Sequence, residues 1–272
     1  MTALIAVMSI LAIVLALQLG LPLMRARRRS RLRLLGLRPE WRALLDAQAP
    51  LYRRVPAPLK PKLEALIGVF VAEKEFVGCA GVHVTEQMKL AIATQACLLI
   101  LNRTEDVYDH LSTILVYPAA FLVPERAIDD AGVVTEERRE LIGQASDTGH
   151  IILSWADVEL ASSDNANVVL HEFAHYLDFE DGAGNGAPVL AAARDYARWS
   201  EVMRSAYARM WHRVRGGRDT VIDEYALEDE AEFFAVATET FFEQSAALRT
   251  EDPLLYAELS RFYQLDPADW PA

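Results

Sequence analysis

The chain has 272 residues, of which 52% are hydrophobic and 24% charged, with a formal net charge of −12. This length is enough for one large domain, or for one domain with an appendage. The total is −12 and residues 25–42 contribute +7, from eight arginines and one glutamate, so residues 43–272 carry −19. A body this acidic repels nucleic acid, and no nucleic-acid partner is expected.

Residues 3–24 contain no charged side chain. Their number is about what a helix needs to cross the roughly 30 Å hydrocarbon core of a membrane. A cleaved signal peptide is the alternative, but no basic segment precedes the apolar run and no small-residue cleavage site follows it. Arginines begin directly at Arg25, and the positive-inside rule keeps such a cluster in the cytoplasm. We therefore expect one transmembrane helix at residues 1–24, in the inner (cytoplasmic) membrane, with the remaining chain cytoplasmic.

Residues 25–58 are expected to be a basic juxtamembrane segment and linker. The arginines suit anionic lipid headgroups at the membrane surface. A nucleic-acid-binding arm is the competing interpretation, and the acidic body argues against it. Pro50, Pro56 and Pro58, followed by Pro61, favour a connection that separates the anchor from the body.

Residues 59–272 are expected to form one domain. Helical spacing of apolar residues predicts a helix at 60–76, and a second, largely buried helix is predicted at 86–101. Short strands are predicted at Val82–Val84, at Ser112–Tyr117 and at His150–Trp155, with a hairpin or surface excursion at 129–147. Cys79 and Cys97 have neither metal-ligand nor disulfide spacing, which favours buried thiols in a reducing compartment.

Residues 164–178 contain the motif around which the rest of the chain is arranged. His171, Glu172 and His175 fit the pattern H-E-x-x-H. On a helix, residues four apart lie on the same face, so both imidazoles can bind one metal ion, with Glu172 beside a bound water. The opposite face is apolar and predicts contact with the core. The candidate N-caps of this helix are Ser163, Asp164 and Asn165.

The glycine-rich segment 181–188 follows this helix rather than a strand, so we expect a mobile loop at the rim of a cleft and not a phosphate cradle. Helices are predicted at 188–215, 225–247 and 253–264. In the second of these, Glu232 has apolar neighbours on both sides, where a carboxylate is costly unless it is paired or binds metal. On spacing alone, Glu239 and Glu243 compete with Glu232 as a third ligand.

The remaining histidines are expected to be surface or hydrogen-bonded residues, because none has a partner at ligand spacing. They are His83, His110, His150 and His212.

The segment His171–Asp178 (HEFAHYLD), together with Tyr225-Ala226 and Ala231–Val236 (AEFFAV), resembles the Mlc titration factor A family. The weaker similarity extends over most of residues 60–267. This resemblance implies a zinc-dependent peptidase of the gluzincin type, with an α+β zincin-like fold that is mainly helical with a small sheet. The anchor departs from the soluble members of that family.

The resemblance also implies the roles of individual residues. One Zn²⁺ per chain would be held by His171, His175 and Glu232. Tyr225 would face the catalytic centre, beside Glu172 as the catalytic acid–base group.

The expected function is hydrolysis of peptide bonds by a metal-activated water, as an aminopeptidase or an endopeptidase acting on a peptide or protein substrate. The alternative is a non-catalytic, zinc-containing binding protein that sequesters a transcriptional repressor at the membrane. The resemblance implies both, because the family's name records binding to a repressor. Glu172 favours the peptidase, since a structural zinc site has a fourth protein ligand and does not need this carboxylate.

Overall fold

The computed structural model describes residues 22–103, 107–119, 122–128, 134–140, 149–160 and 167–271, with residues 8 and 20. The first helices are α2 (Pro39–Gln48), α3 (Pro50–Arg54), α4 (Lys60–Glu73), α5 (Glu86–Ile100) and α6 (Trp155–Leu160). They are followed by α7 (Val168–Asp178), α8 (Asp195–Arg215), α9 (Glu230–Glu243), α10 (Ser245–Glu251) and α11 (Pro253–Tyr263). Short 3-10 turns are η1 (Phe179–Asp181), η2 (Glu224–Leu227) and η3 (Pro267–Asp269).

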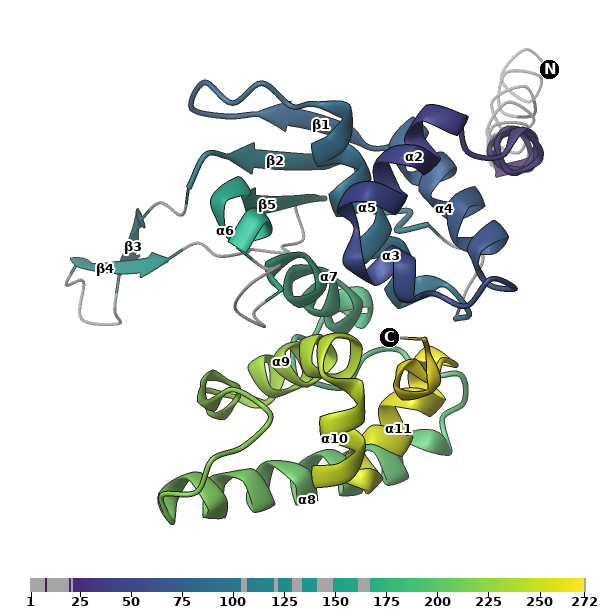
Figure 1. Ribbon diagram of the computed structural model, residues 1–272. Coiled ribbons are helices and arrows are strands. Elements are labelled where there is room, and N and C mark those ends of the chain that lie inside the picture. Colours follow the sequence, from purple (N-terminus) through teal and green to yellow (C-terminus); the bar gives the residue numbers. More distant parts are fainter. Residues whose placement is uncertain are drawn as a thin grey trace.

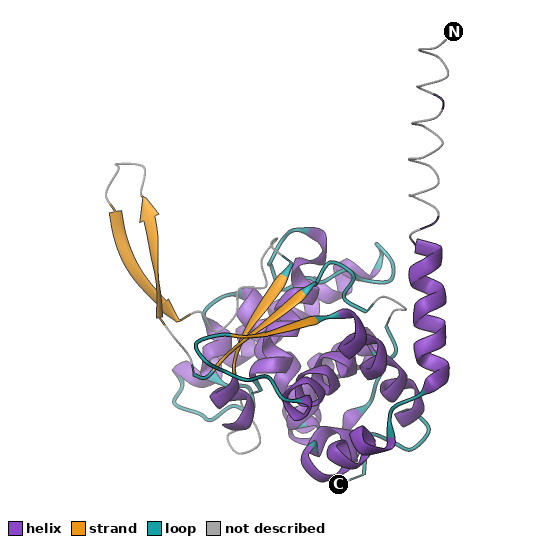
Figure 2. Cartoon of the chain, turned by 90° about the horizontal axis from the view of Figure 1, so that it is seen from above, coloured by secondary structure: helices purple, strands orange, loops and turns teal. Residues whose placement is uncertain are grey.

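The strands are β1 (Glu75–Gly78), β2 (Thr113–Tyr117), β3 (Leu122–Ile128), β4 (Val134–Glu140) and β5 (His150–Ser154). Parallel strands form a sheet in the order β1-β2-β5, and β3 pairs with β4 in an antiparallel hairpin. In β2 and β5 every second residue is buried, so one face of the sheet packs against helices. A mainly helical protein with a small sheet confirms this part of the predicted α+β class (Figure 2).

Helix α7 lies in the middle of the molecule, between the sheet and its helices on one side and α8 to α11 on the other (Figure 1). On the first side, the ring of Phe173 packs against Phe70 of α4 and against Tyr108, at centroid distances of 5.8 and 4.9 Å. On the other side, α9 packs directly on α7. Helix α9 is in turn supported from behind, where Phe234 meets Trp199 of α8 at 5.7 Å. Aromatic contacts therefore hold both helices from their far sides.

Residues 39–54 were expected to belong to a linker, but they form α2 and α3 and join the core. Leu51 and Tyr52 are 5% and 1% exposed. The prolines begin helices here, with Pro39 and Pro50 in the first turns of α2 and α3. Proline suits this position because its fixed φ is already helical and its missing N–H has no partner there in any helix.

A further helix, residues 22–35, runs along one side of the body (Figure 2). Its Arg29 is only 9% exposed, donates to Glu73 of α4 at 2.7 Å, and also pairs with Asp109. This arginine is therefore engaged by the body rather than by lipid headgroups. The part of the chain that the structure describes has no helix long and apolar enough to cross a membrane. The predicted anchor, residues 1–24, lies almost entirely outside that part.

Two strand and helix assignments from the sequence are wrong. Val82–Val84 is irregular, and the strand is instead β1, which the sequence placed at the end of a helix. The turn after β1 is tight, because a Cβ on Gly78 would lie 2.0 Å from the carbonyl oxygen of Val82. The helix predicted from residue 188 begins at Asp195.

The helix predicted at 225–247 is divided into η2, α9 and α10 because Asp229 caps a new helix. The predictions of α4, α5, β2, β5 and α11 hold to within a few residues. The hairpin expected at 129–147 has its strands earlier in the chain, as β3 and β4. Cys79 and Cys97 are free thiols; Cys97 is buried and Cys79 half-buried.

Glu64 of α4 joins the two N-terminal helices to the body. It accepts hydrogen bonds from Arg42 of α2 at 2.5 Å and from the hydroxyl of Tyr52 in α3 at 2.7 Å. The bonds from Arg42 outweigh burial and lower the pKa of Glu64 below its ordinary value. A carboxylate with a lowered folded-state pKa stabilises the protein above its unfolded pKa of about 4.3, and this stabilisation is lost as pH falls through the folded pKa.

We expect Glu64→Gln to lower the melting temperature at pH 7 by about 2–6 °C, because three hydrogen bonds to a charged acceptor, two from Arg42 and one from Tyr52, are weakened. The difference from the parent should shrink toward pH 3, where the parent carboxylate is also neutral. Calorimetry at both pH values measures this. Glu86→Gln is the control: Glu86 pairs with Arg38 on the surface, where both side chains are more than half exposed, and little change is expected. A difference that grows toward acid pH would contradict the account.

Candidate metal centre

Helix α7 places its two histidines at the centre of the molecule. Its N-cap is Asn167, whose side chain accepts a hydrogen bond from the backbone N–H of Leu170 at 3.1 Å. The expected caps, Ser163, Asp164 and Asn165, lie outside the described residues. His171 and His175 are one turn apart and are 8% and 7% exposed. The helical spacing therefore directs both imidazoles into the same buried space.

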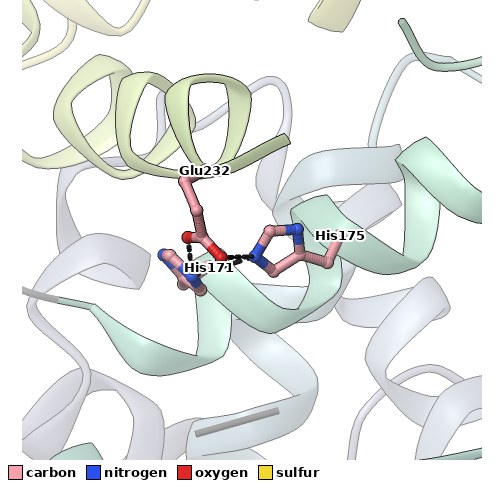
Figure 3. Close-up of side chains that lie close together, drawn as sticks. All are labelled: His171, His175 and Glu232. Carbon is pink, nitrogen blue, oxygen red and sulfur yellow. Dashed lines mark hydrogen bonds and ion pairs between the residues drawn. The ribbon is translucent and has the colours of Figure 1, made fainter. Parts of the chain in front are cut away.

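Glu232 approaches the histidines from α9. The N-cap of this helix is Asp229, whose side chain accepts from the backbone N–H of Glu232 at 2.9 Å and fixes the first turn. The carboxylate of Glu232 points between the two imidazoles (Figure 3). Its oxygens lie 3.1 Å from Nε2 of His171 and 3.4 Å from Nε2 of His175. The structure thus brings the three predicted ligands together, from helices about 60 residues apart in sequence.

The spacing of these atoms fits a tetrahedral metal ion. The two Nε2 atoms are 3.0 Å apart; Oε2 of Glu232 lies 3.1 Å from Nε2 of His171, and Oε1 of Glu232 lies 3.4 Å from Nε2 of His175. Ligands at about 2.0–2.1 Å from a tetrahedral zinc lie about 3.3 Å from one another. Within the described residues, His171, His175 and Glu232 form a group whose ligand atoms are close enough together to hold one metal ion. Two imidazoles and a carboxylate are also ligands that zinc accepts.

The electrostatics of the cluster favour a positive charge. Burial lowers the pKa of His171, but hydrogen bonds to Glu232 and Glu239 outweigh it and raise this pKa to about 10. Burial raises the pKa of Glu232, whereas its bonds to His171 and His175 lower it to about 2. The carboxylates therefore hold a proton on the imidazole, or a metal cation in its place.

Glu239 has a role that the sequence did not reveal. One oxygen lies 2.7 Å from Nδ1 of His171, and the other accepts from the backbone N–H of Asn167 at 2.5 Å. Glu239 therefore orients His171 from behind rather than competing with Glu232 as a ligand. Glu243, the other competitor, accepts from the side chain of Asn167 at 2.6 Å. Glu239 and Glu243 follow Glu232 by seven and eleven residues, which is about two and three helical turns. This spacing places all three acids on the same face of α9.

Glu172 and Tyr225, the predicted catalytic residues, differ in exposure. Glu172 is 1% exposed, and among the described residues its Oε2 has no hydrogen-bond partner. Burial raises the pKa of Glu172 well above its ordinary value, which makes it a stronger proton acceptor. Tyr225 lies in η2, half exposed, with its ring 6.2 Å from the ring of His171. Burial and nearby acids raise the pKa of Tyr225 to about 12, so its hydroxyl remains a donor.

The other histidines lie away from this cluster, as expected. His83, His110 and His212 are exposed, and His150 lies at the start of β5. Glu228 and Glu230 are exposed, and Asp229 between them caps α9. The phenylalanines of α9 are core residues, each 2% exposed or less: Phe233, Phe234, Phe241 and Phe242.

An H-E-x-x-H helix whose histidines meet a glutamate from a second helix is the arrangement of a metallopeptidase. The profile of the glucose-regulated metallo-peptidase M90 family matches residues 23–264. The chain belongs to this family.

Its relatives include proteins of different names. The chain is 40% identical over 233 residues to "Uncharacterized protein slr2042" of Synechocystis sp., covering 84% of this chain and 85% of that protein. It is 33% identical over 228 residues to Mlc titration factor A of Salmonella arizonae, covering 82% and 90%. The Mlc titration factor A of Serratia proteamaculans is 32% identical over 210 residues, covering 76% and 80%. The resemblance drawn from the sequence is thus confirmed, and the family implies a metal ion at the site.

We expect Glu232→Ala and Glu239→Ala to differ in their effect on zinc. Loss of Glu232 removes a charged ligand, so the purified protein should no longer hold about one zinc per chain. Loss of Glu239 leaves all three ligands but frees His171, so the stoichiometry should persist with an affinity lowered about 10- to 100-fold. Elemental analysis and competition with a chelating dye measure the two quantities. Retention of tight zinc by Glu232→Ala, with its loss in Glu239→Ala, would show that the third ligand is Glu239.

Proposed function

We propose that this protein is a zinc-dependent peptidase with a zincin-like catalytic domain. The proposal depends on the convergence of His171, His175 and Glu232. Beside them lies the buried carboxylate of Glu172, whose Oε2 has no hydrogen-bond partner among the described residues. The first three would hold the ion, and Glu172 would do the proton transfer.

When bound, a zinc ion would supply Lewis-acid chemistry, lowering the pKa of water to about 7 and polarising a carbonyl group. Glu172 accepts a proton from the water that attacks the peptide carbonyl, and later donates it to the leaving amine. Its buried position suits this, because a carboxylate with a raised pKa binds the proton more strongly. Tyr225, half exposed and with its ring 6.2 Å from the ring of His171, donates a hydrogen bond to the carbonyl oxygen as negative charge develops on it.

The sheet supplies a place for an extended peptide. Among the described strands, β5 is at the edge of the β1-β2-β5 sheet, and it packs near α7. An edge strand offers backbone N–H and C=O groups to a further strand, so a substrate could bind by adding to β5.

The second candidate is a non-catalytic zinc protein that sequesters a transcriptional repressor at the membrane. The name Mlc titration factor A, carried by relatives, favours binding to such a regulator. A structural zinc site would close with four protein ligands, whereas the described cluster offers three. The open position and Glu172 favour the peptidase, and the two activities are compatible in one chain.

We also propose that the protein is anchored in the inner membrane by a single helix, with the body in the cytoplasm. The support is in the sequence: residues 3–24 are uncharged and arginines follow at once. The helix of residues 22–35 continues from this region and is joined to the body through Arg29. The body would then be held close to the membrane surface.

We expect Glu172→Gln to keep its zinc and its fold but to lose peptide hydrolysis by about 10²- to 10⁴-fold. The amide is nearly isosteric with the carboxylate but cannot take up the proton. Tyr225→Phe should lose less, about 10- to 1000-fold, because it removes one hydrogen-bond donor only. Turnover of a peptide library, with zinc content measured on the same samples, separates these effects. Glu172→Gln with zinc bound and parental turnover would exclude Glu172 as the base.

The topology proposal predicts that a reporter fused to the C-terminus is active when it requires the cytoplasm and inactive when it requires the periplasm. The arginines from Arg25 onward determine the orientation of the anchor under the positive-inside rule. Replacing the exposed Arg25, Arg27 and Arg31 by glutamine should therefore lower the fraction of chains with a cytoplasmic C-terminus. Fractionation shows in parallel whether the chain sediments with membranes. A periplasmic reporter signal would contradict the orientation, and a chain that stays in the supernatant would contradict the anchor.

A further inference from the structure

Gly186 lies in the segment between α7 and α8 and contacts three helices. It is buried, and its N–H donates to Oδ2 of Asp178, at the end of α7, at 2.8 Å. Its carbonyl oxygen accepts from the indole Nε1 of Trp199 in α8 at 2.9 Å. Both backbone groups of one residue are therefore used to join two helices.

The third contact is with the first turn of α9. Gly186 has φ +71°, a conformation that glycine adopts without strain and other residues disfavour. A Cβ at this position would lie 2.3 Å from the carbonyl oxygen of Glu230 and 2.9 Å from its carbonyl carbon. Glu230 is the first residue of α9, two residues before Glu232. The absence of a side chain thus lets the loop backbone lie directly against the turn that carries the third predicted ligand.

Asp178 completes the connection to the histidines. It is fully buried, and it follows His175 by three residues, which is close to one turn of the same helix. Among the described residues its other oxygen, Oδ1, has no hydrogen-bond partner. Burial of a carboxylate costs hydration, and the contact that Asp178 supplies in return is the bond that Oδ2 accepts from Gly186.

We propose that Asp178, Gly186 and Trp199 form a clamp that sets the distance between the histidines of α7 and Glu232 of α9. The clamp rests on the metal site of the proposed function and assigns positioning roles to residues outside that site. Asp178 ties the loop to the end of α7, Trp199 holds it from α8, and Gly186 presses against the start of α9. Because Asp229 caps this first turn at the backbone N–H of Glu232, a shift of Glu230 moves Glu232 with it.

The chain offers a matched pair of glycines to test this. Gly182 and Gly186 lie in the same loop with φ +89° and +71°, but a Cβ on Gly182 would meet nothing within 4 Å. Alanine therefore adds similar backbone strain at both positions and contacts α9 at only one. We expect Gly186→Ala to weaken zinc binding about 10- to 100-fold relative to Gly182→Ala, measured by competition with a chelating dye. Equal affinities in two folded variants would overturn the clamp.

Asp178→Ala and Asp181→Ala form a second pair. Each carboxylate accepts a backbone N–H of this loop, but Asp181 is exposed and accepts from Ala183 rather than from Gly186. Asp178→Ala should weaken zinc binding about 10- to 100-fold, and Asp181→Ala should leave it within about twofold of the parent. Parental affinity in Asp178→Ala would overturn the proposal.

Trp199→Phe covers the case in which the alanine variants fail to fold. It keeps an aromatic ring against Phe234 and removes only the indole donor, so zinc affinity should fall about two- to tenfold, the usual effect of one hydrogen bond. An unchanged affinity in this folded variant would also overturn the clamp. Peptide turnover by the parent is measured separately: a parent that binds zinc but cleaves nothing ends the peptidase proposal and leaves the clamp standing.

Discussion

The packing of α9 on α7 is the contact on which the rest of this structure depends. It brings a carboxylate within 3.1 and 3.4 Å of two imidazole nitrogens that helical geometry has already placed on one face. Neither helix could hold this arrangement alone. Phe173 fixes α7 against α4, and Phe234 fixes α9 against α8, so the core on each side determines where the two helices meet. Stability and function are therefore coupled through the same interface.

The cost of the arrangement is a concentration of acids in the interior. Glu172, Glu239 and Asp178 are 1%, 7% and 0% exposed, and Glu232 joins them at the interface. Like charges at this density repel one another and lose hydration, so the interface is unfavourable as a purely structural device. A divalent cation would offset both effects. Burial of several acids close together disfavours folding, and such unfavourable arrangements are typical of functional sites.

The sequence predicts a large part of this site, for reasons that differ from residue to residue. Helical periodicity alone predicts the placement of His171 and His175, because residues four apart on an amphipathic helix lie on the same face. Glu232 does not follow from spacing, since Glu239 and Glu243 are equally placed, and only the family resemblance singled it out. The structure separates the three by their contacts: Glu232 lies between the two imidazoles, and Glu239 lies behind His171.

What the sequence did not reveal depends on contacts between distant segments. Asn167 caps α7 and also bonds to Glu239 and Glu243. Gly186 lets the loop lie against α9. No pattern in the neighbouring sequence predicts either role. The N-terminal helices were missed because prolines were interpreted as breaks, although proline is equally suited to the first turn of a helix. Likewise, Arg29 has the sequence context of a membrane-surface arginine and the structural context of a buried ion pair. Local pattern predicts elements well, but it does not predict which partners they meet.

The central claim is that α7 and α9 together build one three-ligand metal site. Anomalous diffraction at the zinc edge, from crystals of the zinc-loaded protein, tests it most directly. The account predicts one strong peak per chain, about 2.0–2.2 Å from Nε2 of His171, Nε2 of His175 and a carboxylate oxygen of Glu232. A peak bound by other residues, or a zinc bound by the histidines with Glu232 turned away, would contradict it.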